Sequence, residues 1–418
     1  MAAALGVLAS CGSVKSGEEA IAASRESKVV VAYVTSWSEV MPDPQYMTHI
    51  NYAFGHVNES FNGVKIDNEE RLRQIVDLRK QKPELKVLLS IGGWGSGRFS
   101  EMAANDEYRR AFAADCDRVV KEFALDGIDI DWEYPTSSMA NISSSPDDTE
   151  NFTLLMQDIR AAIGNEKELT LATVASARYI DFKAILPSVD FVNIMAYDMA
   201  SAPKHHSALY PSGHSGDITS DGAVTAHLKA GVPPSKLVMG MPFYGRGGDG
   251  YPSFQDYNKV GNTDTQYTEK WDEVAQVPYL ADKNDTLVFG FENPRSLAIK
   301  CQYILDKDLL GGMYWDYSGD NEQGDLRRTV AENLLGKPHK AKVLVLTERG
   351  GQHGGFTDAG LKWLAAEGAK GNFSITEINN ARNITEAYLS QFSLVIQLDF
   401  PPYTWPKEAE DAFVKYIE

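Results

Sequence analysis

Eight short apolar runs alternate with amphipathic stretches along most of the chain. The runs are rich in β-branched and aromatic residues, as strands are, and they begin at Val29, His49, Lys86, Asp126, Leu169, Asp190, Lys236 and Gly311. Between several of them, stretches such as NEERLRQIVDLRKQ, DEYRRAFAADCDRVVKEFA and TENFTLLMQDIRAAI place apolar residues three and four positions apart, the spacing of an amphipathic helix. Eight strands alternating with helices predict an α/β fold, a (β/α)8 TIM barrel over residues 29–336.

Two further segments depart from this alternation. An irregular stretch of about residues 247–293, with scattered Tyr, Trp and Gly, separates the seventh and eighth strands and predicts a small insertion subdomain above the strand ends. A new strand and helix begin at Lys342 in KVLVLTERGGQHGGFTDAGLKWLAAEG, and FSITEIN and LVIQLDF follow as strands. These strands predict a partial, doubly wound α/β domain over residues 342–418.

Length and composition agree with a large folded domain followed by a smaller one. The chain has 418 residues, of which 43% are hydrophobic, and a formal net charge of −18. Such negative charge repels nucleic acid and anionic lipid, so we expect neither as a partner. It favours a neutral or cationic substrate, although it is equally explained as a contribution to solubility.

The three cysteines fall into two classes. Cys116 and Cys301 lie in predicted helices without metal-ligand spacing, which is typical of small buried apolar residues, although a disulfide between them stays open. Cys11 ends a short apolar run, Leu8 to Cys11, that resembles the lipobox of bacterial lipoproteins; an accidental apolar N-terminus is the alternative. The resemblance implies lipidation at Cys11, a signal and tether over residues 1–28, and a place in the bacterial cell envelope, on the surface or in the periplasm, or secretion.

The sequence DGIDIDWEYP places carboxylates in a predicted buried strand. Side chains alternate between the two faces of a strand, so Asp129, Asp131 and Glu133 share one face and the apolar residues between them share the other. In a barrel the apolar face packs against the outer helices, and the three acids point inward. Interior carboxylates this close are costly unless they share protons, which raises the pKa of at least one member.

Glu133 is the natural general acid of this group. It comes last, at the C-terminal mouth where barrel enzymes form their active sites. The alternatives are an interior hydrogen-bond network or a metal site. A metal would require histidines or further carboxylates from other strands, and the other strand ends supply aromatic residues instead. We therefore expect neither a metal nor a cofactor.

Five motifs in order resemble glycoside hydrolase family 18, the chitinase family, over residues 29 to 336. Asp126, Asp129, Asp131 and Glu133 match its DxxDxDxE pattern. The other motifs are SIGGW (Ser90 to Trp94), MAYD (Met195 to Asp198), GMPFYGR (Gly240 to Arg246) and GGMYWDYSGD, which contains Trp315. The resemblance implies hydrolysis of β-1,4-linked N-acetylglucosamine with retention, in which the acetamido oxygen of the substrate is the nucleophile.

The same resemblance implies a role for each matching residue. Glu133 protonates the leaving oxygen and later activates water, Asp131 orients the acetamido N–H, and Asp129 holds the proton that Asp131 exchanges. Tyr197 donates its hydroxyl to the acetamido carbonyl, and Trp315 forms the apolar floor of the site. Asp198 contacts the same sugar, and Tyr33 and Phe54 are further predicted substrate contacts. The remaining predicted contacts, each of which could instead be a core residue, are Trp94, Met195, Tyr244 and Arg246.

Three readings of the function follow from the resemblance. The first is a chitinase acting on chitin or chitooligosaccharides, with an insertion short enough to leave a shallow groove. The second is an endo-β-N-acetylglucosaminidase acting on N-glycans or another glycan that contains N-acetylglucosamine. The third is a non-catalytic glycan-binding lipoprotein, which the presence of Glu133 disfavours. In each case contact with a membrane would be only through the lipid anchor.

The segment from Lys342 resembles the trehalose-utilisation-type domain, which has a glutamine-amidotransferase-like α/β fold. VLVLTERGGQHGGFTDAG and LDFPPYTWP carry the resemblance over about 75 residues. Because the resemblance implies no defined chemistry, we assign this segment no activity. His353, within the glycine-rich stretch, is either a site residue or an exposed loop histidine.

Overall fold

The computed structural model describes residues 28–248, 251–260, 267–336, 341–347, 354–371, 373–382, 384–390, 392–398 and 405–417. The chain divides into two compact units, Met1–Gly336 and Lys337–Glu418. Cys11 and His353, together with the predicted tether up to residue 27, lie outside the described residues.

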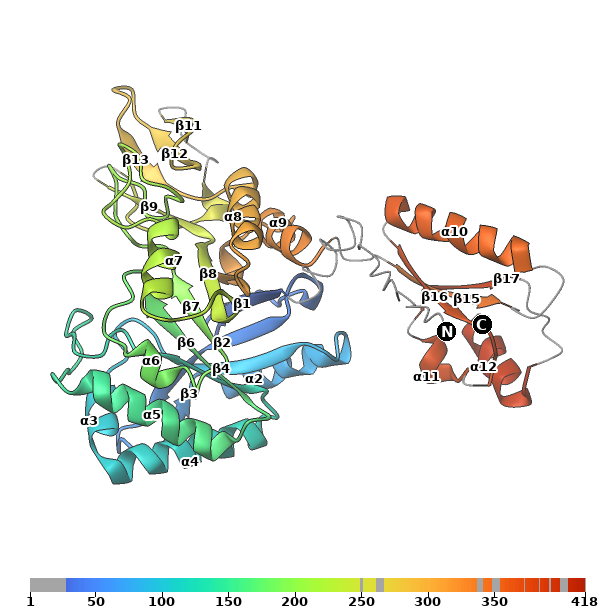
Figure 1. The fold of residues 1–418 in the computed structure, drawn as a ribbon, viewed down its shortest axis with the longest axis horizontal. Helices are drawn as coiled ribbons and strands as arrows, with labels where there is room; N and C mark the ends of the chain where they lie inside the picture. The colour runs from blue at the N-terminus through green and yellow to red at the C-terminus, as the bar shows by residue number, and fades with distance from the viewer. Residues whose placement is uncertain are drawn as a thin grey trace, which may run out of the picture. The chain divides into compact units, whose positions relative to one another are not determined.

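Eight parallel strands close into a barrel, which confirms the fold predicted from the sequence (Figure 1). They pair in the order β1, β14, β8, β7, β6, β5, β4, β2, and β2 pairs again with β1. The strands are β1 (Val29–Thr35), β2 (His49–Val57), β4 (Lys86–Gly92), β5 (Gly127–Asp131), β6 (Glu168–Val174), β7 (Phe191–Met195), β8 (Leu237–Pro242) and β14 (Gly311–Trp315). A short strand that the sequence pattern did not predict, β3 (Val64–Ile66), pairs antiparallel with β2.

Helices connect these strands around the outside of the barrel. They are α2 (Glu69–Val76), α3 (Phe99–Ala104), α4 (Asp106–Glu122), α5 (Asp148–Ile163), α6 (Phe182–Ile185), α7 (Ser220–Lys229), α8 (Pro294–Asp306) and α9 (Asp325–Leu334). Local sequence sets their starts. The Asn105 side chain accepts from two backbone N–H groups at the start of α4, and α8 begins with a capping box between Asn293 and Ser296.

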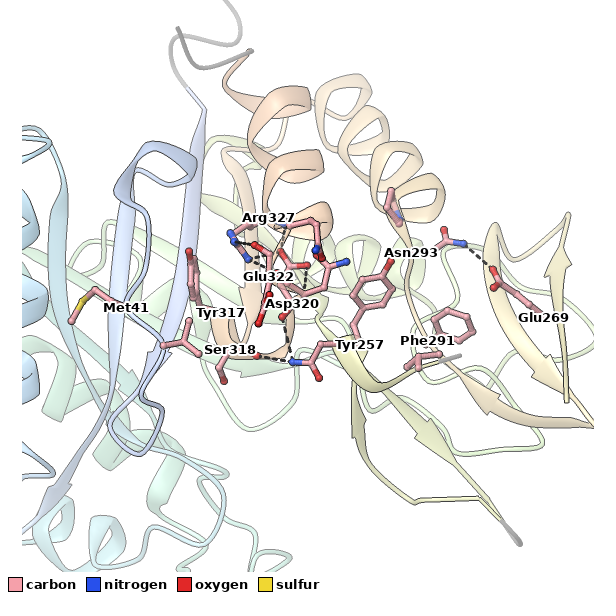
Figure 2. Close-up of a pocket in the computed structure, with 16 residues that line it drawn as sticks. Met41, Tyr257, Glu269, Phe291, Asn293, Tyr317, Ser318, Asp320, Glu322 and Arg327 are labelled. Atoms are coloured by element: carbon pink, nitrogen blue, oxygen red, sulfur yellow. Dashed lines mark hydrogen bonds and ion pairs between the residues drawn. The ribbon is translucent and has the colours of Figure 1, made fainter. Parts of the chain in front are cut away.

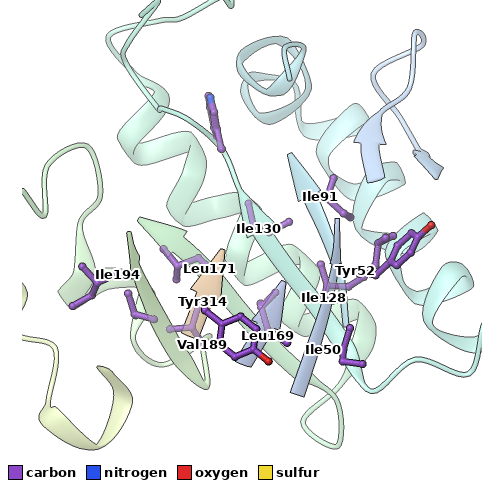
Figure 3. Close-up of a cluster of buried hydrophobic side chains, with 14 of the residues drawn as sticks. Ile50, Tyr52, Ile91, Ile128, Ile130, Leu169, Leu171, Val189, Ile194 and Tyr314 are labelled. Carbon is purple, nitrogen blue, oxygen red and sulfur yellow. The ribbon is translucent and has the colours of Figure 1, made fainter. Parts of the chain in front are cut away.

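The main hydrophobic core lies between the strands and these helices (Figure 3). Ile128 and Ile130 of β5 and Leu169 and Leu171 of β6 are fully buried in it, on the outward faces of their strands. Cys116 of α4 and Cys301 of α8 are also buried there, and both are free thiols rather than a disulfide. The outward faces are therefore apolar, which leaves the inward faces to carry polar chemistry.

The insertion between the last two barrel strands is a five-stranded antiparallel sheet with the order β10, β9, β13, β12, β11. Its strands are β9 (Tyr244–Gly247), β10 (Gln255–Asp256), β11 (Thr268–Asp272), β12 (Val277–Ala281) and β13 (Leu287–Gly290). The sheet begins at Tyr244, ahead of the stretch that looked irregular in the sequence. Because β8 ends at Pro242, Tyr244 and Arg246 belong to the insertion sheet rather than to the seventh barrel strand.

The second unit contains a three-stranded parallel sheet with β15 at its centre, between β16 and β17. Its elements are β15 (Ala341–Thr347), α10 (Gly354–Gly371), β16 (Phe373–Ile378), α11 (Glu386–Leu389), β17 (Leu394–Leu398) and α12 (Lys407–Ile417). Leu344 and Leu346 of β15 pack in one apolar cluster, and Val343 and Val345 pack in another on the opposite face. Apolar cores on both faces are the arrangement of a doubly wound sheet.

Replacing Leu169 by alanine removes a fully buried side chain from the barrel core. We expect the free energy of unfolding to fall by about 2–5 kcal/mol, because both the lost burial and the residual cavity contribute. Chemical denaturation followed by circular dichroism measures this change. Val274→Ala, at an exposed position, is the control and should cost less than about 0.5 kcal/mol. Equal losses in the two variants would contradict this account of the core.

Candidate active site

The three inward acids occupy successive levels of strand β5 and the turn that follows it. Asp129 and Asp131 are buried inside the barrel, and Glu133 lies half-buried beyond the end of the strand. The intervening Trp132 packs with the isoleucines of β5 in the outer core. The strand therefore alternates as the sequence pattern predicts, and it brings a column of carboxyl groups to the mouth of the barrel.

Asp129 is held by hydrogen bonds from four different strands. One carboxylate oxygen accepts from the Tyr33 hydroxyl of β1 at 2.9 Å and from the Ser90 hydroxyl of β4 at 2.8 Å. The other accepts from the Thr170 hydroxyl of β6 at 2.6 Å and from the Asn193 amide of β7 at 3.4 Å. Burial raises the pKa of Asp129 above its ordinary value, although these hydrogen bonds act to lower it.

The next two acids, Asp131 and Glu133, both have raised pKa values. Burial, followed by the charges of Glu133 and Asp129, raises the pKa of Asp131 well above its ordinary value. Burial also raises the pKa of Glu133 to about 7, against a lowering hydrogen bond with Tyr134. The Asp131 Oδ1 atom is buried and receives no hydrogen bond from any residue within the described part of the chain. The pair can therefore hold a transferable proton beside a free acceptor oxygen.

Glycines at the end of β4 allow the chain to pass close to Asp131. A Cβ atom on Gly92 would come within 1.9 Å of the Asp131 carbonyl oxygen, and Gly92 has a φ of 133°. The Gly93 N–H donates to the same carbonyl oxygen at 2.8 Å. Only glycine tolerates both the contact and this backbone conformation, which explains the paired glycines after Ser90.

Asp198, after the end of β7, is an ionised counterpart to the protonated acids. Burial acts to raise its pKa, but hydrogen bonds from Arg246 and His206 hold it well below its ordinary value. Arg246 binds both oxygens of the Asp198 carboxylate at 2.7 Å, and the Tyr244 hydroxyl donates to Oδ1 at 2.9 Å. The sequence predicted Tyr244 and Arg246 as substrate contacts but not as partners of Asp198. It missed His206, whose ring lies 3.6 Å from Asp198 Oδ1 and is buried.

Tyr197 places a phenol beside the acids. Its side chain is buried in a small cluster inside the barrel mouth, where Met195 also packs. Burial, followed by the negative charge of Asp131, raises the pKa of Tyr197 well above its ordinary value. The phenol therefore stays protonated and can donate a hydrogen bond.

The aromatic floor of the site is a group of rings around Trp315, at the end of β14. The Phe54 ring stacks on the Trp315 ring with centroids 5.5 Å apart, and the Tyr33 ring lies 5.7 Å away. Trp37, in the loop after β1, lies 6.4 Å from Trp315 and is 64% exposed. These rings present an apolar surface next to the acids, which suits the C–H face of a sugar ring.

Trp94 stands on another side of the acids and is 62% exposed. It contacts the acid column through Tyr134, whose ring centroid lies 6.5 Å from that of Trp94. Tyr134 in turn stacks on Tyr179 at 5.5 Å. Sequence reasoning overlooked both tyrosines. The position of Tyr134 directly after the acid was an available signal, whereas the contact of Tyr179 depends on the fold.

The arrangement as a whole combines a proton donor of near-neutral pKa, a buried acceptor, a phenol donor and an apolar floor. Among the residues that the structure describes, no three histidine, cysteine or acidic side chains form a group able to hold a metal ion. The described side chains therefore supply acid–base chemistry on a polar substrate that presents an apolar face.

Comparison with known proteins relates this site to a glycoside hydrolase family. The family model described as glycosyl hydrolases family 18 matches residues 29–320, which include every acid described above. Chitotriosidase-1 of Mus musculus is 31% identical, with 71% of this chain and 74% of that protein covered. Chitinase A1 of Niallia circulans is 29% identical; the match covers 73% of this chain but only 58% of that longer protein.

Solved structures agree with these sequence relatives. The family 18 N-acetylglucosaminidase from Paenibacillus barengoltzii matches with a TM-score of 0.68 and 32% identity, covering 73% of this chain and 99% of that one. Chitinase ChiW from Paenibacillus sp. str. FPU-7, described as a cell-surface-expressed multi-modular enzyme, matches with a TM-score of 0.67 and 30% identity. That match covers 76% of this chain and 45% of ChiW.

Removing the hydroxyl of Tyr134 tests the hydrogen bond at the acid. In Tyr134→Phe we expect the pKa of the Glu133 carboxyl to rise above about 7, because this hydrogen bond lowers it. Carboxyl-carbon NMR titration measures the midpoint, which belongs to the interacting pair of Asp131 and Glu133. Tyr179→Phe, in the ring stacked on Tyr134, is the control and should leave the midpoint unchanged. A midpoint that stays in place or falls in Tyr134→Phe would refute this assignment.

Proposed function

Because this chain belongs to the glycosyl hydrolases family 18, we propose that it hydrolyses β-1,4-linked N-acetylglucosamine chains, such as chitin or chitooligosaccharides, with retention at the anomeric carbon. One observation carries the proposal. The acid column ends in Glu133, with a pKa of about 7, while the neighbouring Asp131 presents a buried oxygen without a donor among the described residues. A general acid and a group that can accept an N–H therefore lie next to each other.

The first step breaks the glycosidic bond. Glu133 transfers its proton to the leaving oxygen while the substrate's acetamido oxygen attacks the anomeric carbon, forming a cyclic oxazolinium ion. Asp131 accepts the acetamido N–H through its free oxygen and offsets the positive charge that develops. In the second step the Glu133 carboxylate takes a proton from water, and the resulting hydroxide opens the ring with overall retention.

The surrounding residues hold the sugar for this attack. Tyr197 donates its hydroxyl to the acetamido carbonyl, and the raised pKa that burial gives it keeps the phenol protonated. Asp198 contacts the same sugar. Its carboxylate is fixed in orientation because Arg246 donates a hydrogen bond to each of its two oxygens. Asp129 takes up or releases the proton that Asp131 exchanges, a role that the pKa raised by its burial supports. Trp315 packs beneath the sugar ring.

Trp94 and the rings of Tyr134 and Tyr179 suit the leaving-group side of the bond. Trp94 is largely exposed, so a bound sugar would bury apolar surface there. Its ring contacts the ring of Tyr134, which is the residue directly after the general acid Glu133. Substrate units on both sides of the bond would then rest on aromatic rings.

The cellular location of the protein and the relationship of its second unit are two separate proposals. Lipid anchoring through Cys11 in a bacterial envelope is supported by the sequence from Leu8 to Cys11, and membrane fractionation of a Cys11→Ser variant tests it. None of the helices in the described ranges is both long enough and apolar enough to span a membrane.

For residues 342–418 we propose only the trehalose-utilisation-type relationship, supported by the parallel sheet β16, β15, β17.

Glu133→Gln should lower kcat on chitohexaose by about 100- to 10,000-fold while leaving affinity within a few-fold, because it removes the proton and little of the shape. Mass spectrometry of the products over time measures both the rate and the fragment sizes. Glu122→Gln, on the surface of α4, is the control and should keep full activity. If Glu133→Gln kept its turnover, Glu133 would not be the general acid of this reaction. A high-mannose glycoprotein assayed in parallel shows whether N-glycans are released instead.

Participation of the acetamido group is tested with two aryl glycosides that differ only in that group. We expect the wild-type protein to cleave the 2-acetamido substrate at least about 100-fold faster than its 2-hydroxy analogue, because the analogue lacks the nucleophile. Release of the aryl alcohol, followed by absorbance, gives kcat/KM for each. Equal rates on the two glycosides would contradict substrate assistance, whatever the effect of Glu133→Gln.

A further inference from the structure

A cavity of about 960 Å³ lies apart from the acid column (Figure 2). Five segments line it. They are the loop between β1 and β2, the insertion around η4 (Tyr257–Lys259), Glu269 of β11, the residues at the start of α8, and the segment from η5 (Tyr317–Gly319) to the first turn of α9. None of the acids of the active site is among its lining residues. Its size is within the range of pockets that hold small ligands.

Two of these segments connect the cavity to the active site. Tyr317 follows Trp315 closely in the chain, and Met41 lies in the same loop as Trp37. The Tyr317 hydroxyl accepts from the backbone N–H of Asp43 at 2.9 Å, which joins the two segments to each other. The segments that carry Trp37 and Trp315 of the aromatic floor therefore also form one wall of the cavity.

A buried ion pair gives this wall a fixed shape. The Asp320 carboxylate accepts from the backbone N–H groups of Leu326 and Arg327 at 3.1 and 2.9 Å, and from the Arg327 guanidinium at 3.1 Å. The Asn258 amide donates to the Ser318 and Asp320 carbonyls at 3.2 and 3.3 Å, which fixes the insertion against the same segment. The polar groups are therefore positioned before any ligand arrives, which lowers the entropic cost of binding.

The lining chemistry narrows the class of ligand. The lining residues include three carboxylates, on Glu269, Asp320 and Glu322, and a single guanidinium, on Arg327, so an anionic ligand is disfavoured. Glu322 is exposed and can accept hydrogen bonds from hydroxyl groups. The Arg327 Nη1 atom is already occupied by Asp320 and the Asn321 carbonyl, so Arg327 shapes the wall more than it offers charge to a ligand. These groups suit an uncharged ligand rich in hydroxyls.

Aromatic side chains complete the lining. The rings of Tyr257, Phe291 and Tyr317 border the cavity, and Figure 2 shows Tyr257 between the Asp320 segment and Phe291. Tyr257 is only partly buried, so its ring retains surface that a ligand can cover. Sugars combine hydroxyl groups with apolar C–H faces, and aromatic rings pack against those faces.

We propose that this cavity is an accessory saccharide-binding site for uncharged, N-acetylglucosamine-containing chains, separate from the acid column. The inference rests on the proposed function, because that function brings such chains to this end of the barrel. The accessory site holds a second portion of glycan without taking part in bond cleavage.

Isothermal titration calorimetry of Glu133→Gln with chitotetraose tests the site, because this variant binds without consuming the probe. We expect two binding events per chain. Adding Tyr257→Ala should remove one event or weaken it at least about tenfold, and adding Trp315→Ala should affect only the other. Tyr210→Ala removes a surface tyrosine outside the cavity and should leave both events. Tyr257→Ala alone should cleave a short aryl chitobioside at the wild-type rate.

Glu322→Trp offers an independent test if Tyr257→Ala fails to fold. This substitution fills the cavity from an exposed position and should remove the same event. A single binding event in Glu133→Gln, or two events that persist in both Tyr257→Ala and Glu322→Trp, would overturn the accessory site. Those results are distinct from failure of the proposed function, in which the wild-type protein leaves chitohexaose uncleaved. Cleavage with only one binding event would overturn the accessory site alone.

Discussion

The hydrogen bonds to the buried carboxylate of Asp129 are the interaction on which the rest of the active site depends. A carboxyl group at the centre of a barrel loses its hydration, and the loss costs several kcal/mol unless hydrogen bonds replace it. Here Tyr33, Ser90, Thr170 and Asn193, each from a different strand, supply those bonds. Where barrel interiors are usually packed with branched aliphatic side chains, this layer is polar, and its bonds connect four strands at one level.

That anchor sets the environment of the acids above it. Asp131 and Glu133 follow Asp129 on the same face of the chain. Burial raises the pKa of both, and the charges of Glu133 and Asp129 raise the pKa of Asp131 further. Asp198 meets the opposite environment, because Arg246 and His206 hold its pKa low. Carboxyl groups of similar intrinsic acidity are thereby separated into proton donors and a permanent anion, which is the division that acid–base catalysis requires.

The insertion contributes to the site as well as to the wall beside it. Tyr244 and Arg246 come from β9, the first strand of the insertion sheet, and both contact Asp198. Farther along the insertion, Asn258 bonds to the segment that follows Trp315. The insertion is therefore fixed to the barrel at two places, one beside the acids and one beside the accessory cavity. Changes in its length would alter both places, because each depends on where the insertion sheet begins and ends.

The sequence alone determined the barrel and the identity of its acids. Periodic apolar positions are local, so the strands from Val29 to Trp315 and the inward face of β5 could be predicted from spacing. Contacts between distant segments could not. His206, Tyr179, the four donors to Asp129 and the cavity lined by Tyr257 and Arg327 each depend on strand register and on loops meeting across the barrel mouth. Local patterns encode which way a side chain faces, whereas only tertiary packing decides what it meets there.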